Sequence, residues 1–381
     1  MVTFKQVVEL EQQLRETPVL SVFLPQVLQD PAQRHGWRVA LNDAIRGITS
    51  AQEAASHEER GNLAAALEQL EHEIERIGGR VSTSGWIGYI GAGRTWLASP
   101  LRITPPLLVH WGLGIRVAPL LPALHEPPPV AVGIVESGNA DVYRWDGAEL
   151  TRVDTLHAHA HTEPVTHMGA TPRQGFHSGT RGRTGHDQAE RERLVGHHRM
   201  VRTLVERLTE VAGPRGWILL GGAPAARHDA WLALANRGQG AARELAELHL
   251  GATPFEVAQR VADGVKRMQD DADERRVEAV LDASAAGGRG VCGISPTLSA
   301  LSAGVVNEVL LSAQLVTASP MEAERVVGKA LQAGVRVTCV SARAAELLDA
   351  RAGGVASERW FASPTSRPAS GELTSVEGEG T

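Results

Sequence analysis

The C-terminal third of the chain alternates short apolar runs with helix-like segments, and this alternation restricts the fold more than any other feature. The runs RGVCGI, NEVLLS and VRVTCV are each followed by a segment with helical spacing. A long helix precedes them, and its start at Thr253-Pro254-Phe255-Glu256 has the residues of a capping box. Ser319-Pro320-Met321-Glu322 predicts a second capping box. Strand–helix alternation favours parallel pairing with right-handed crossovers, so residues 253–363 are predicted to form an α/β domain.

The three prolines of His125–Pro129 mark a domain boundary, because consecutive prolines cannot continue a helix or a central strand. Before them, helical patterns at about 3–16, 34–49 and 51–77 combine with short apolar strands such as VLSVFLP. Residues 1–126 are therefore expected to be an α+β domain. At the other end, residues 364–381 are rich in Ser, Pro, Gly and Glu and are expected to be a disordered tail.

Residues 127–252 are predicted to form a middle domain. The segments VAVGIVES, ADVYRW and LTRVDTLHAH predict a three-stranded meander, with a hairpin turn at Trp145–Ala148. A helix is expected from Asp187 to about Val211, followed by the buried strand WILLGG at 217–222. The fold class is thus α/β, in three α/β or α+β domains.

A basic, glycine-rich loop at 169–187 lies between the meander and this helix. It contains five glycines and three arginines, and no Asp or Glu occurs from Pro164 to His186. Such a loop is either an idle surface linker or a segment that orders on a polyanion. Thr184 and Asp187 have capping-box spacing, and a helix N-terminus beside arginines favours phosphate.

The composition limits the partners. The chain has a net charge of −6, so an anion-binding site must be local. No apolar run is long enough for a membrane span, and the N-terminal segment has no signal-peptide pattern, so a cytoplasmic protein without membrane or DNA partners is expected. No Walker or G-x-G-x-x-G motif is present, and no cofactor is expected.

A histidine cluster leaves a metal site open. His157, His159 and His161 alternate along a strand, with His167 and Glu163 nearby, and could share a metal or form a solvated strand edge. The solvated edge is the preferred interpretation, and no metal site is predicted.

The segment GGRGVCGISPTLSALSAGVVNEVLLS (287–312) resembles the C-terminal domain of the archaeo-eukaryotic release factor and Pelota superfamily. The segments TPVLSVFLP and GNADVYRWDGAELTRVDTL resemble the N-terminal and middle domains of the bacterial branch, which includes Balon-like ribosome hibernation factors. The resemblance covers nearly all of residues 17–363, and the order of the three domains carries it more than any single motif does.

This resemblance implies a tRNA-shaped protein that occupies the ribosomal A site, in hibernation or in rescue. It implies contact with ribosomal RNA and with a translational GTPase such as EF-Tu. Release factors carry Gly-Gly-Gln in the middle-domain loop, whereas this loop reads Arg173-Gln174-Gly175, and the codon-reading Asn-Ile-Lys-Ser motif is missing. Gly238-Gln239-Gly240 lies in the wrong part of the domain. Occupancy without catalysis is therefore predicted.

Two alternatives stay open. One is peptidyl-tRNA hydrolysis, with Gln174 as the catalytic amide, and the other is a ribosome-independent RNA- or protein-binding stress module. The predicted RNA-binding residues come from the loop and the start of the following helix. They are Arg173, Gln174, His177, Arg181, Arg183, His186 and Arg191.

Overall fold

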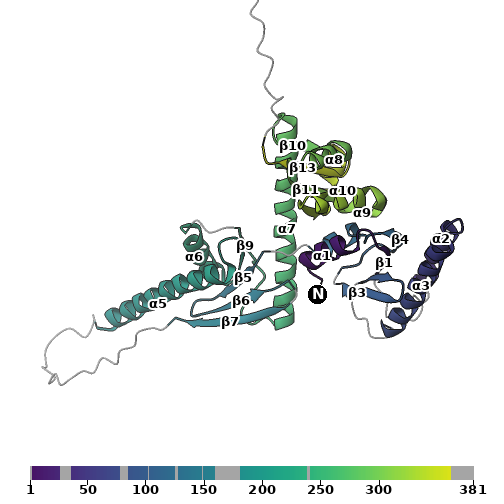
Figure 1. Cartoon of the computed structure of the whole chain (residues 1–381). Helices are drawn as coiled ribbons and strands as arrows, with labels where there is room; N and C mark the ends of the chain where they lie inside the picture. The colour runs from purple at the N-terminus through teal and green to yellow at the C-terminus, as the bar shows by residue number, and fades with distance from the viewer. Residues whose placement is uncertain are drawn as a thin grey trace, which may run out of the picture. The chain divides into compact units, whose positions relative to one another are not determined.

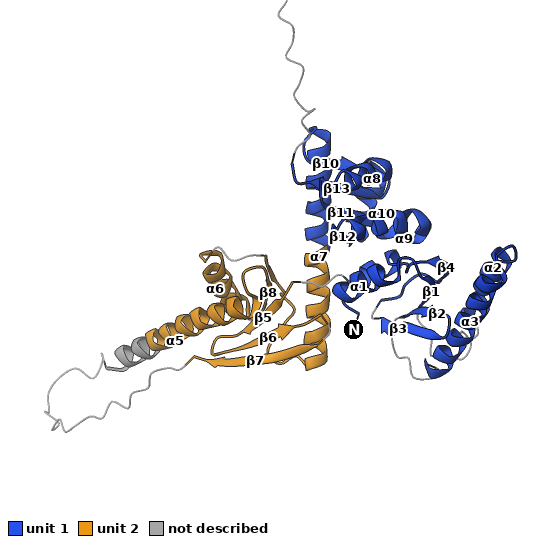
Figure 2. Ribbon diagram, in the orientation of Figure 1, with its two compact units in different colours: residues 1–125, 270–381 blue, residues 126–269 orange. Residues whose placement is uncertain are grey.

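A computed structural model describes residues 2–25, 36–77, 85–101, 103–124, 128–147, 149–158, 181–237 and 241–361, with only the backbone described for 181–189. The chain forms two compact units (Figure 2). Unit 1 combines residues 1–125 with 270–381, and unit 2 comprises residues 126–269. Helix α7 (Pro254–Ala285) contributes to both units. Three sheets, each accompanied by helices, confirm the predicted α/β fold class. The division into the domains 1–126, 127–252 and 253–363 stays a prediction.

The N-terminal part of unit 1 is an antiparallel sheet with the strand order β3-β2-β1-β4. Strand β1 is central and buried on both faces, as its continuous apolar run predicts. Its Val19 and Phe23 pack in one core cluster, and Leu20 and Val22 in another. The elements are α1 (Phe4–Leu14), β1 (Pro18–Pro25), α2 (Gly36–Ala51), α3 (His57–Ile77), β2 (Gly85–Gly91), β3 (Arg94–Leu101), β4 (Leu108–Leu113), the 3-10 helix η1 (Ala118–Leu120) and α4 (Leu121–Leu124).

The C-terminal part of unit 1 is a mixed sheet with the order β10-β13-β11-β12. Strands β11 and β12 pair in parallel, as the alternation predicts. Strand β13, which the alternation does not predict, lies between β10 and β11 and pairs antiparallel with both, so β10 and β11 run in the same direction but do not pair directly. Gly353 and Gly354 both have positive φ and reverse the chain into β13, whose sequence VASER has no long apolar run. The elements after α7 are β10 (Gly290–Cys292), α8 (Ile294–Ser302), β11 (Val306–Ser312), α9 (Ala313–Ala318), α10 (Pro320–Gln332), β12 (Arg336–Val340), α11 (Ala342–Ala352) and β13 (Val355–Arg359).

Unit 2 is built on a five-stranded sheet with the order β7-β6-β5-β8-β9. The predicted meander is confirmed, since β5 pairs with β6 and β6 with β7 in antiparallel fashion. Strand β8 lies parallel to β5, which its connection through a helix allows. The elements are β5 (Val130–Val135), β6 (Asn139–Trp145), β7 (Leu150–His157), α5 (Arg181–Ala212), β8 (Trp217–Gly222), α6 (Pro224–Ala235) and β9 (Ala242–Glu244).

Helices cover both faces of the sheet in unit 2. Helices α5 and α6 lie beside β5 and β6 (Figure 1), and Leu204 and Leu208 of α5 and Ala230 of α6 share a core cluster with alternate residues of these strands. On the opposite face, Gly264 of α7 lies against Leu219 of β8. The central strands β5 and β8 are therefore buried throughout.

The capping predictions have different outcomes. The Thr253–Glu256 box is confirmed: the Glu256 N–H donates to Thr253 Oγ1 at 3.3 Å, and the Thr253 N–H donates to Glu256 Oε2 at 2.9 Å. The Thr253 N–H, and then the Thr253 hydroxyl, donate to the Glu256 carboxylate and lower its pKa. The box at Ser319 is wrong, because the Ser319 side chain makes no capping bond. Ser319 also ends α9, and its φ of −137° and ψ of 65° serve that end.

None of the described helices is long and apolar enough to cross a membrane.

Candidate functional site

The predicted RNA-binding residues fall on the loop before α5 and on α5 itself. Arg173, Gln174 and His177 lie outside the described residues. The backbone of α5 includes Arg181, Arg183 and His186, and Arg191 is exposed on it. The RNA-binding role of all seven residues stays a prediction.

Helix α5 begins earlier than the sequence predicts. It spans Arg181–Ala212, so the predicted start at Asp187 is wrong, and so is the predicted cap at Thr184, which lies inside the helix. Each residue added to a helix forms a further backbone hydrogen bond, and this gain offsets the cost of about 1 kcal/mol for a glycine. Gly182 and Gly185 therefore do not delay the start of the helix.

One exposed stripe of α5 carries cations. Arg191, His198 and Arg202 follow one another at intervals of seven and four residues and are all exposed. These intervals place them on one face of the helix, with the exposed Arg199 beside them. Within the described part of the chain, none of these three arginines forms an ion pair. We call these four residues the basic stripe.

Two carboxylates in the C-terminal half of the same helix pair with other arginines. Glu206 pairs with Arg237 at 2.9 Å, and Glu210 pairs with Arg207 at 2.7 Å. Arg207 also reaches Asp154 of β7 at 3.0 Å. Exposed ion pairs add little to stability, but here they take Glu206 and Glu210 away from Arg199 and Arg202 of the basic stripe.

The opposite face of α5 holds the helix on the sheet. Leu208 is fully buried and lies so close to Gly133 of β5 that a Cβ there would be 2.9 Å from a Leu208 methyl group. This apolar face fixes which side of α5 points outward. Its buried residues are Met200, Val201, Leu204, Val205, Leu208 and Ala212.

The adjacent histidines of α5 have different surroundings, because neighbouring residues of a helix point about 100° apart. His197 Nε2 lies 3.0 Å from Asp229 Oδ2 of α6, whereas His198 is exposed. His197 therefore ties α5 to α6, and only His198 can meet a partner.

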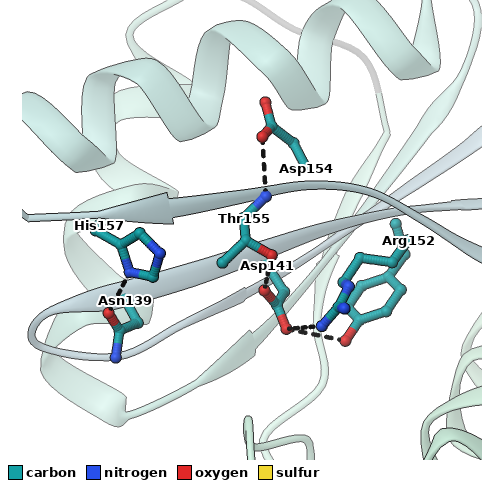
Figure 3. Close-up of polar contacts among 7 residues, drawn as sticks. Asn139, Asp141, Arg152, Asp154, Thr155 and His157 are labelled. Atoms are coloured by element: carbon teal, nitrogen blue, oxygen red, sulfur yellow. Dashed lines mark hydrogen bonds and ion pairs between the residues drawn. The ribbon is translucent and has the colours of Figure 1, made fainter.

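A ladder of polar side chains crosses the β6–β7 hairpin (Figure 3). His157 Nδ1 lies 2.8 Å from Asn139 Oδ1, and these two residues are also paired in the strand register. Asp141 accepts from the Thr155 hydroxyl at 2.7 Å and from the Tyr143 hydroxyl at 3.1 Å. The ladder ends at His157, one residue before the last described residue of this segment.

The carboxylate of this ladder is fully engaged. Asp141 is only 9% exposed, and besides its two hydroxyl donors it has Arg152 at 3.8 Å. Burial, and then the charge of Asp141, raise the pKa of Tyr143. A carboxylate with these partners stabilises the hairpin and is not free to act as a base on a ligand.

The histidine cluster at the end of β7 is described only in part. His157 contacts Asn139, and His159, His161 and His167 lie outside the described residues. Within the described ranges, no group of three or more His, Cys, Asp or Glu residues could hold a metal ion.

Sequence reasoning missed part of the basic stripe. Arg202 was not among the predicted contacts, although its spacing from Arg191 is visible in the sequence, and His198 was interpreted only as a surface or RNA-facing group together with His197. Only packing of the helix shows that this face is exposed. The Asp141–Thr155–Tyr143 contacts depend on strand register and had no sequence signal of their own.

Comparisons with known proteins agree with the sequence resemblance. Residues 116–282 match the model of bacterial archaeo-eukaryotic release factor family 10. No curated protein matches the chain.

Several solved structures align with long stretches of the chain. An archaeal translation termination factor, aRF1, covers 94% of this chain and 99% of its own at 16% identity and a TM-score of 0.25. Archaeoglobus fulgidus Pelota covers 73% of this chain and 79% of its own at 12% identity and a TM-score of 0.39. Archaeal Pelota, in a model of its ribosome-bound form with ABCE1, covers 73% of this chain and 78% of its own at 15% identity and a TM-score of 0.41. Identities and TM-scores this low assign no function. The predicted resemblance to the bacterial branch of the archaeo-eukaryotic release factor superfamily is confirmed by the family match over residues 116–282.

Proposed function

We propose that the protein binds ribosomal RNA through the basic stripe of α5 and the neighbouring loop 169–187, and occupies the ribosomal A site in hibernation or rescue. The observation that carries this proposal is the stripe: Arg191, Arg199 and Arg202 are exposed and form no ion pair among the described residues, while Glu206 and Glu210 of the same helix pair with other arginines. The release-factor family match supports the ribosome as the source of the RNA. In this proposal a translational GTPase such as EF-Tu is a further partner.

Phosphate contacts make affinity depend on salt, because binding releases condensed counterions. Each phosphate contact contributes about 0.7–0.9 to the slope of log K against log salt. We therefore expect Arg199→Gln/Arg202→Gln to bind ribosomes more weakly and to reduce this slope by about 1.5. The measurement is co-sedimentation of the full-length chain with purified ribosomes over a salt series.

The matched control is Arg215→Gln/Arg267→Gln, which removes the same charge from exposed positions of unit 2 outside the stripe. We expect the control to keep the slope of the unaltered protein. Equal losses in both double variants would show a nonspecific charge effect, and no binding of the unaltered protein at low salt would refute the proposal.

A hydrolytic role through Gln174 is the second candidate, and the match to a release-factor family favours it. A release assay with stalled peptidyl-tRNA complexes separates the two roles. Peptide release by the unaltered protein that Gln174→Ala abolishes would assign hydrolysis, whereas ribosome binding without release agrees with occupancy. Crosslinking to RNA outside the ribosome only would support the independent stress module.

A further inference from the structure

Residues 116–118, which we call the strap, are held by three strands of the N-terminal sheet of unit 1. The Arg116 N–H donates to Ser21 Oγ of β1 at 3.1 Å, and the Arg116 carbonyl accepts from the Tyr89 hydroxyl of β2 at 2.6 Å. The Arg116 guanidinium lies 2.5 Å from His110 Nε2 of β4. Burial and this guanidinium lower the pKa of His110 to about 4, so the imidazole accepts this bond in its neutral form.

The same strap is also bound by the C-terminal part of unit 1. Glu324 of α10 is only 7% exposed, and its carboxylate accepts from the Val117 N–H at 2.9 Å and from the Ala118 N–H at 2.9 Å. One side chain of α10 thus binds two successive backbone amides of the strap. The residue just before them, Arg116, is bound to the N-terminal sheet.

Glu324 has no ion-pair partner among the described residues. Burial raises its pKa, against the lowering effect of the two amide donors and of Arg116, while Glu11 raises it further. A buried carboxylate regains hydration when it leaves its amide donors, and this offsets part of the cost of breaking the two bonds.

We propose that Glu324 is a latch that holds the N-terminal and C-terminal sheets of unit 1 in a fixed arrangement, and that its release from the strap amides lets the two sheets shift relative to each other. Apolar contacts between the two parts also exist, since Leu120 of η1 and Val326 of α10 lie in one core cluster. The latch supplies the hydrogen bonds of this junction, which depend on geometry in a way that the apolar contacts do not. It is the part that a single proton or a competing donor can open.

Hydrogen exchange in the full-length chain tests the latch. In Glu324→Ala, we expect the Val117 and Ala118 amides to exchange at least tenfold faster, because hydrogen bonds to a charged acceptor are worth about 1.5–3 kcal/mol. Amides inside the two sheets, such as those of Ile87 and Leu310, should stay within about twofold of their original rates, since only the junction opens. Labels at the exposed positions Arg60 and Glu346 should give a broader distance distribution.

Two further variants keep this test decisive. Glu324→Gln retains the shape of the side chain but loses its charge and one acceptor oxygen. We expect the exchange rates of the Val117 and Ala118 amides to rise about fivefold in this variant. Glu322→Gln removes an exposed carboxylate from the same helix and should change nothing. Unchanged strap exchange in both Glu324 variants would overturn the latch, as would equally faster exchange throughout unit 1 or an unchanged label distribution.

Discussion

Gly222→Ala is expected to lower the stability of unit 2 by about 3–5 kcal/mol, the sum of backbone strain and overpacking. Gly222 ends β8 with a φ of 110°, a conformation that residues with a Cβ rarely adopt. A Cβ at this position would lie 1.8 Å from the Val135 carbonyl oxygen of β5. Because the obstacle is the backbone of a central strand, the strain cannot be relieved by rotating a side chain.

Calorimetry of the full-length chain measures this effect, with hydrogen exchange at β5 and β8 to assign the transition of unit 2. A decrease in Tm of roughly 10 °C is expected for a unit of this size. Gly138→Ala is the control, because Gly138 follows β5, the strand that Gly222 approaches, and a Cβ there meets no atom within 4 Å. This control should change the stability by less than about 0.5 kcal/mol. Equal Tm values for the two variants would contradict the geometry at the end of β8.

Leu208→Ala is expected to cost about 2–5 kcal/mol, because it leaves a cavity between α5 and the sheet. Leu208 is fully buried and packs in the cluster that joins α5 to β5 and β6. The loss should also weaken ribosome binding near the melting temperature, since the basic stripe keeps its direction only while α5 is docked.

Leu194→Ala is the matched control on the same helix. Leu194 is 52% exposed, and its truncation should change stability by less than about 0.5 kcal/mol. The measurement is again calorimetry with exchange at α5 amides. A larger loss for Leu194→Ala than for Leu208→Ala would mean that the buried face of α5 is assigned to the wrong side.

Local patterns were sufficient for much of the architecture. The apolar run of β1, the meander of β5 to β7 and the capping box at Thr253 all follow from residues that are close together in the chain. Each depends on local physics, namely side-chain period, turn chemistry and bonds between residues three apart. The loop 169–187 was also recognised locally, by its glycines and its lack of acids.

The pairing partners of the strands and the first and last residues of the helices were harder to predict from the sequence. The short strands β9 and β13 have no distinctive period, and the antiparallel pairing of β13 with β10 and β11 depends on where α11 returns the chain. The early start of α5 depends on whether new backbone hydrogen bonds outweigh a cost of about 1 kcal/mol for each glycine. Helix propensities alone do not predict where the helix then begins. Ser319 ends α9 and also precedes α10, and its side chain makes no capping bond to α10.

For this protein the sequence alone determined the α/β class, the order of its segments, the release-factor resemblance and the basic character of the loop and helix. Only the tertiary structure decided which arginines of α5 stay unpaired, since Glu206 and Glu210 meet cations from elsewhere in the fold or one turn away. It likewise decided that Glu324 meets amides more than 200 positions away in the chain. Contacts of this kind depend on packing between distant segments, and no local periodicity encodes them.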